Sequence, residues 1–238
     1  MVKRMLTILF FAFFIACSKE EPIIMKKEMK TTDEHQPALI EEEKEDEVDA
    51  LIEFTFPEEQ VIINLKNIPI LNEYLQATND KEKAIRNMDL IPIETEENDI
   101  FLLEFSCENE HCSYLLLHQD TKNQAYLVAD LARYSQVLFS PDHNKALLKF
   151  DRNADSAESL TDLIVIDIQN WQQIQLLTPE EINTQILNFQ WPITANHWID
   201  NQSISVSVPM FSELDDELIS QEKEIENQTT DITFYLDD

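Results

Sequence analysis

Residues 100–118 read IFLLEFSCENEHCSYLLLH, and this stretch decides the fold class. Two apolar runs, 100–106 and 113–118, each have the length and composition of a β-strand, and the residues between them are mostly polar. The pattern predicts an antiparallel hairpin. Cys107 and Cys112 fall at the two ends of its connection, which places them across the hairpin from each other.

Similar runs follow along the chain and predict an antiparallel meander. We expect strands at 125–130, 145–151, 163–168, 173–177, 186–190 and 203–208, separated by turns rich in Asn and Asp. The alternating residues 232–236 predict a last strand that returns to pair with 203–208. Helical spacing appears at 70–77 and 81–88, with Asn79-Asp80 as a cap before the second segment, and a helix start appears at 178–181. The fold class expected is mainly β, with one or two short helices on the N-terminal side.

One part of the meander resembles a repeat of the TolB-like β-propellers. The residues that carry the likeness are Ser140-Pro141-Asp142, the strand 146–150 and the strand 163–167, with a second copy at 198–201 and 204–208. His143 stands where that family has Gly. The resemblance implies propeller-like hairpins. The strand-rich part suffices for two or three blades, and a closed propeller needs at least about four, so we expect an open array and not a closed propeller.

The first residues have the pattern of a signal for export from the cytoplasm. Lys3 and Arg4 precede the apolar run LTILFFAFFI at 6–15, which is too short to span a bilayer as a helix. Residues 14–17, FIAC, resemble the lipobox of bacterial lipoproteins, with Phe14 where the family usually has Leu. The resemblance implies that 1–16 is a signal peptide and that Cys17 carries a diacylglyceryl anchor. The alternative is an ordinary secretory peptide with an unrelated cysteine.

Composition divides the remainder of the chain. Residues 17–50 are strongly acidic and predict a lipidated, disordered tether. Residues 51–238 are expected to form a β-rich globular domain with a mobile acidic loop at 212–230.

The absence of glycine and the net charge of −30 exclude several classes of protein. Phosphate-binding loops, dinucleotide-binding fingerprints and the Gly-x-Ser-x-Gly nucleophile elbow all require glycine. Strong negative charge disfavours nucleic-acid binding and broad adsorption to anionic lipid. Membrane attachment therefore needs a covalent or apolar device.

Cys107 and Cys112 are an even pair in an exported chain once Cys17 is lipidated, which favours a disulfide. The alternatives are free thiols or a metal site that uses Cys107, His111, Cys112 and His118. A Cys-x-x-Cys redox motif is absent.

Three weaker patterns can each be interpreted either as a functional site or as a structural feature. Oxygen ligands at calcium-loop spacing occur at Asp151, Asn153, Asp155 and Asp162, but Ser156 replaces the turn glycine, and a polar hairpin connection is the favoured interpretation. Ser140 beside Asp142 and His143 suggests a hydrolase triad, although sequence neighbours seldom adopt triad geometry. A set of aromatic residues either lines a ligand groove or belongs to the core. These residues are Trp171, Trp191, Trp198 and Phe189.

The sequence therefore predicts a lipid-anchored protein on the extracytoplasmic side of the cell membrane. We expect a non-enzymatic accessory or protein-interaction module of the cell envelope, without a cofactor. Its expected partners are the bilayer, through acylated Cys17, and an envelope protein, with no nucleic acid. The alternatives are an envelope lipoprotein that binds a small ligand or cation, and an envelope hydrolase.

Overall fold

The computed structural model describes residues 23–28, 36–44, 47–93, 95, 99–119, 125–153, 159–177, 189, 191–209 and 229–237. The helical elements are η1 (Leu65–Asn67), α1 (Pro69–Ala77) and α2 (Lys81–Arg86). The strands are β1 (Ile24–Glu28), β2 (Ala38–Lys44), β3 (Glu47–Thr55), β4 (Glu59–Asn64), β5 (Asp89–Ile93), β6 (Ile100–Glu108), β7 (His111–His118), β8 (Tyr126–Phe139), β9 (Lys145–Asn153), β10 (Ser159–Asp167), β11 (Gln172–Leu177), β12 (Ala195–Asp200), β13 (Ser203–Pro209) and β14 (Thr229–Asp237).

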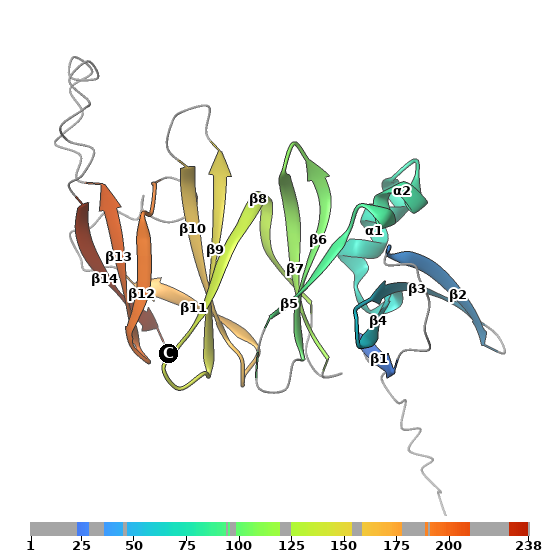
Figure 1. The fold of residues 1–238 in the computed structure, drawn as a ribbon, viewed down its shortest axis with the longest axis horizontal. Coiled ribbons are helices and arrows are strands. Elements are labelled where there is room, and N and C mark those ends of the chain that lie inside the picture. Colours follow the sequence, from blue (N-terminus) through green and yellow to red (C-terminus); the bar gives the residue numbers. More distant parts are fainter. Residues whose placement is uncertain are drawn as a thin grey trace, which may run out of the picture.

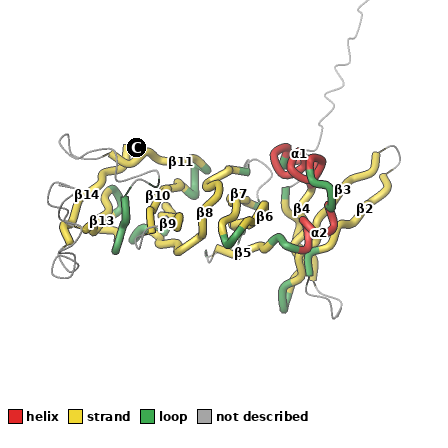
Figure 2. Tube along the Cα trace, turned by 90° about the horizontal axis from the view of Figure 1, so that it is seen from above, coloured by secondary structure: helices red, strands yellow, loops and turns green. Residues whose placement is uncertain are grey.

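The strands form a row of antiparallel sheets along the longest axis of the molecule (Figure 1). Sheet A has the order β1-β4-β3-β2. A continuous ladder of ten strands, β12-β13-β14-β11-β10-β9-β8-β7-β6-β5, forms the rest. Figure 2 shows the same row from above, with the two helices beside sheet A. The fold is thus mainly β and antiparallel, as predicted, and sheet A and β12–β14 lie at opposite ends, so the row does not close into a ring.

Two strands let the ten-stranded ladder fold into three layers, sheets B, C and D. β8 pairs with β7 through its first half, in sheet B, and with β9 through its second half, in sheet C. β11 pairs with β10 in sheet C through 172–174 and with β14 in sheet D through 175–177. Register shifts along β8, together with the positive φ of Leu131, bend the strand between its two sheets.

Alternating apolar residues explain the stacking of the sheets. On β6, Phe101 and Leu103 pack into the core between sheets A and B, whereas Leu102 packs into the core between sheets B and C. On β9, Phe150 faces sheet B and Leu147 faces sheet D. A strand buried on both faces is apolar at nearly every position, and this explains runs such as 100–103 and 163–166.

The predicted helices are confirmed. α1 buries Leu71 and Leu75 in the core between sheets A and B, and α2 adds Ile85. The Asp80 side chain accepts a hydrogen bond from the backbone N–H of Lys83 and caps α2.

The structure differs from the predicted tether at 17–50. Ile24–Glu28 pairs with β4, and Ala38–Lys44 pairs with β3. Ile23 and Ile24 are buried, and Lys26 forms an ion pair with Glu59 at 3.2 Å. The acidic composition of 17–50 as a whole predicted disorder. That prediction is wrong for these two segments because β4 and β3 pair with them and because Ile23 and Ile24 are buried at the first of them.

The returning strand is confirmed. β14 lies between β13 and β11, with Val206 opposite Ile232 and Ile204 opposite Phe234. The sequence did not reveal β4, β5, β12 or the second half of β8. Most of the strand predicted at 186–190, the helix start at 178–181 and nearly all of the acidic loop at 212–230 lie outside the described residues.

Candidate functional site

Sheet D presents an outer face at one end of the row, with no described sheet beyond it (Figure 1). Its inner face carries Ile204, Val206, Ile232 and Phe234, which pack against sheet C. By strand alternation the outer face carries Ser203, Ser205 and Ser207 on β13, and Thr229, Asp231, Thr233, Tyr235 and Asp237 on β14. This face is rich in residues that carry hydroxyl groups, although Ser203 and Ser205 are buried.

An apolar row crosses the outer face of sheet D. Tyr235 is the register partner of Leu177 on one side and of Ser203 on the other. Tyr235 is 52% exposed and Leu177 is 39% exposed. Ile199, which is 51% exposed, lies in the β12–β13 bulge beside Ser203. These are three of the seven large apolar side chains that the described residues expose, and they gather at one end of one sheet.

A recess of about 550 Å³ lies at the opposite end of the molecule, between β2 and α2. Leu39 and Ile85 supply apolar lining, and Glu41, Glu82 and Arg86 supply charge. Arg86 pairs with Glu82 at 3.4 Å on the helix surface.

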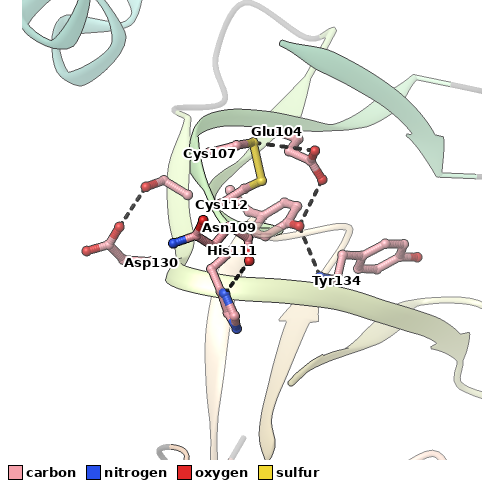
Figure 3. Close-up of a disulfide and its surroundings, with 9 residues drawn as sticks. Glu104, Cys107, Asn109, His111, Cys112, Asp130 and Tyr134 are labelled. Atoms are coloured by element: carbon pink, nitrogen blue, oxygen red, sulfur yellow. Dashed lines mark hydrogen bonds between the residues drawn. A yellow bond between two sulfur atoms is a disulfide. The ribbon is translucent and has the colours of Figure 1, made fainter. Parts of the chain in front are cut away.

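The predicted disulfide closes the β6–β7 hairpin between Cys107 and Cys112 (Figure 3). Cys107 is exposed, and Cys112 is buried in the core between sheets B and C. Three residues of the hairpin have positive φ without being glycine: Ser106 at 54°, Asn109 at 50° and Glu110 at 67°. The covalent bond holds a turn whose backbone these residues adopt at a cost in free energy.

Glu104 links the disulfide to a buried tyrosine (Figure 3). Its Oε1 lies 3.5 Å from the Cys107 sulfur, and its Oε2 accepts a hydrogen bond of 2.8 Å from the Tyr114 hydroxyl. That hydroxyl accepts in turn from the backbone N–H of Tyr134. Burial raises the pKa of the Tyr114 phenol well above its usual range, and the hydrogen bond and charge of Glu104 raise it further, against the effect of the Tyr134 N–H. The phenol therefore stays protonated and fixes the carboxylate.

The histidines of the metal alternative do not join the cysteines. His111 Nδ1 lies 2.9 Å from the carbonyl oxygen of Asn109. His118 lies at the far end of β7, where its Nε2 is 3.0 Å from Asp99 and its ring packs edge-on against Trp171. Glu104 is the residue that joins the cysteines, because its carboxylate and the two sulfur atoms all lie within 4.8 Å of one another. No sequence motif singled out Glu104, although its position near the end of the first strand of the hairpin was a signal.

The calcium candidates do not converge. Asp151 lies opposite Thr161, whereas Asp162 lies opposite Phe150, so the two carboxylates are on opposite faces of the β9–β10 hairpin. Asp151 is buried and accepts a hydrogen bond of 2.9 Å from the Thr161 hydroxyl. Asn153 ends β9, and Asp155 lies outside the described residues.

Ser140, Asp142 and His143 build a turn. The buried Ser140 hydroxyl donates to Asp142 at 2.6 Å and accepts from the backbone N–H of Lys145 at 3.0 Å. His143 has φ of 60° and stacks on Phe139. The hydrogen bond from Ser140 is the main reason why the pKa of Asp142 is lowered. The serine hydroxyl bonds directly to the carboxylate, with no histidine between them, so these groups do not have triad geometry.

The tryptophans pack in the interior. Trp171 is buried between sheets B and C, and Trp191 and Trp198 pack against the core between sheets C and D. Phe189 lies under the Arg152 guanidinium, 4.2 Å from ring centroid to Cζ. The interpretation of these side chains as core is the one that fits.

The signal peptide predicted at 1–16 and the lipidation site at Cys17 lie outside the described residues. Within the residues described, no helix is both long and apolar enough to cross a membrane. No family model, curated protein or solved structure matches the chain.

Proposed function

We propose that this protein is a non-enzymatic interaction module of the cell envelope, anchored by lipid at Cys17, that docks an envelope protein on the outer face of sheet D. The observation that carries the proposal is the apolar row of Leu177, Tyr235 and Ile199 on that face.

The composition of the face suits reversible protein binding. Tyrosine is enriched among the residues that dominate binding energy, because it buries a large ring at a small cost in side-chain entropy. Beside Tyr235 on the same face of β14, Thr233 and Asp237 provide polar groups that can form hydrogen bonds at the border of the interface. An apolar patch with polar neighbours is the usual anatomy of such an interface.

Charge defines the partner. The chain has a net charge of −30, and Asp237 lies two residues from Tyr235 on the same face of β14. The partner surface that fits is a basic one with an apolar centre. Association with such a partner is faster at low salt, because opposite charges steer the encounter and salt screens them.

The arrangement of the chain suits an anchored receptor. The N-terminal strand β1 belongs to sheet A, and sheet D is at the other end of the row (Figure 1). A lipid at Cys17 holds the sheet A end toward the membrane and presents sheet D away from it.

Site-specific photo-crosslinking in intact cells tests the docking face. A photoreactive residue at Tyr235 is expected to give a discrete adduct that weakens when Leu177→Ser is added. The matched control is the same residue at Leu131, because Leu131 and Tyr235 are equally exposed, at 52%, on different sheets. Identical adducts from both positions, unaffected by Leu177→Ser, contradict the proposal.

Fractionation tests the anchor. Cys17→Ala is expected to move the protein out of the membrane fraction or to leave it as an uncleaved precursor, because the acylated cysteine is the attachment. A processed variant that sediments with membranes as the wild type does contradicts the lipid anchor.

A second candidate function is capture of a small ligand in the recess between β2 and α2. Its volume of about 550 Å³ and its mixed lining favour a cationic ligand with an apolar body. Leu39→Trp fills the recess and is expected to abolish any ligand-induced rise in Tm, whereas Leu131→Trp is expected to preserve it. A ligand that stabilises both variants equally binds elsewhere.

A further inference from the structure

The β6–β7 hairpin contains the parts of a metal site that its disulfide blocks. We infer that reduction of Cys107–Cys112 converts this hairpin into a binding site for a thiophilic divalent cation such as Zn²⁺, with Cys107, Cys112 and Glu104 as ligands. The bond is the switch: the oxidised hairpin excludes the ion and the reduced hairpin takes it.

One sulfur–oxygen distance in the oxidised hairpin already suits the ion, and reduction frees the two sulfur atoms to separate. Zn–S bonds of about 2.3 Å and Zn–O bonds of about 2.1 Å at tetrahedral angles place sulfur and oxygen about 3.6 Å apart. The Cys107 sulfur and Glu104 Oε1 are 3.5 Å apart. The Cys112 sulfur belongs to the same cluster, in which every pair of ligand atoms is within 4.8 Å.

The carboxylate is held in position by its surroundings. The sulfur atoms of a disulfide carry no hydrogen, so the contact between Glu104 Oε1 and Cys107 is not a hydrogen bond in the oxidised protein. Glu104 Oε2 is fixed by the hydroxyl of Tyr114, which is 1% exposed and bonded also to Tyr134 N–H. A partner behind the carboxylate orients the oxygen that faces the ion, as outer-shell groups do in metal proteins.

The hairpin also offers a route for the ion. Cys107 is exposed and Glu104 is half-buried, while Cys112 is anchored in the core. The ion enters from the Cys107 side, and water completes a tetrahedral set there.

The chemistry balances in two steps. A dithiol reductant gives two electrons and two protons to the disulfide, which becomes two thiols, while the reductant becomes a disulfide. The divalent cation then displaces both thiol protons to solvent and binds two thiolates and one carboxylate, for a net site charge of −1.

Cobalt titration of the full-length protein tests the inference. Anaerobically reduced and desalted protein is expected to bind one Co²⁺ per chain, with thiolate-to-cobalt charge-transfer absorption and the strong visible bands of tetrahedral cobalt. Zn²⁺ is expected to bleach these bands and to protect both cysteines from alkylation. The oxidised protein is expected to give neither response.

Variants separate the three ligands from adventitious thiol binding. Glu104→Gln is expected to weaken cobalt affinity by about tenfold or more, and Tyr114→Phe by about tenfold, because it frees the carboxylate. The control is Glu110→Gln, which removes an exposed charge from the same hairpin without touching the cluster.

Three results overturn the inference. One is reduced protein that shows no tetrahedral cobalt bands. Another is equal affinity in Glu104→Gln and Glu110→Gln. The third is loss of the β-sheet circular dichroism signal on reduction, because a site that depends on Tyr114 and Glu104 requires the folded hairpin.

Discussion

The β6–β7 and β8–β9 hairpins solve the same problem by different means. Both turn the chain without glycine, and both hold ordinary residues at positive φ, Asn109 and Glu110 in the first and His143 in the second. The first is closed by a covalent bond between Cys107 and Cys112. The second is closed by the Ser140 hydroxyl, which bonds to the Asp142 carboxylate and to the Lys145 N–H.

Because of this difference, we expect the β6–β7 hairpin to be sensitive to redox conditions and the β8–β9 hairpin to be sensitive to pH. A disulfide stabilises chiefly by restricting the unfolded chain, and it responds to reductants. A turn built on a carboxylate is weakened when the carboxyl group is protonated, because the neutral group is a poorer hydrogen-bond acceptor. Both turns have residues at positive φ. The interaction that stabilises each turn therefore decides which condition destabilises it.

Removal of the disulfide is expected to have the largest effect. Cys107→Ala with Cys112→Ala should lower the free energy of unfolding by about 2 kcal/mol, the chain-entropy value for a short loop. Urea unfolding under non-reducing conditions measures it. Addition of a reductant should bring the wild type to the level of the double variant and leave the variant unchanged. Equal stability of the oxidised wild type and the variant contradicts the role given to the bond.

Ser140→Ala is expected to cost about 1.5 kcal/mol. The substitution removes a bond to a carboxylate and leaves the Lys145 N–H without the hydroxyl acceptor at a position that is 1% exposed. The loss should persist in reductant, unlike that of the cysteine variant. Ser135→Ala, at an exposed position of β8, is the control and should change the unfolding midpoint little. A loss as small as that of the control shows that the hydroxyl does not hold the turn.

Acid is expected to weaken the β8–β9 hairpin more than the β6–β7 hairpin. The folded-state pKa of Asp142 is depressed below 3.8, mainly by the Ser140 hydroxyl. A depressed pKa gives stability that is complete above the unfolded-state value and is lost as the pH falls through the folded-state value. Asp142→Asn should therefore destabilise at neutral pH and by less in acid, in urea titrations at each pH. A difference from wild type that is independent of pH rules out this linkage.

His143→Gly is expected to have the smallest effect, a gain of about 0.5 kcal/mol. Glycine relieves the positive φ of 60°, which costs an ordinary residue about 1 kcal/mol, but the stack on Phe139 is lost. Asn109→Gly should gain less, because asparagine tolerates the left-handed region better. Thermal unfolding compares the two variants. A larger gain at Asn109 than at His143 reverses the ranking of strain.

Local patterns predicted much of the fold. Alternation found the last strand at 232–236, helical spacing found α1 and α2, and the spacing of Cys107 and Cys112 found the disulfide. Local patterns failed where the composition of a segment predicts disorder but its packing makes it a strand. Segments 24–28 and 38–44, which lie within the acidic stretch 17–50, are strands because β4 and β3 offer them partners. The mean charge of a segment does not indicate which strand its backbone pairs with.

The sequence by itself determined the strands that are buried on both faces, the two short helices, the turns without glycine and the pairing of the cysteines, because each depends on neighbours close in the chain. Tertiary structure alone decided which residues meet across sheets. Glu104 reaches the disulfide through the bulged register of β6, and Leu177 meets Tyr235 only because β14 inserts beside β11. Register between distant strands follows from the packing of whole sheets, and no local pattern encodes it.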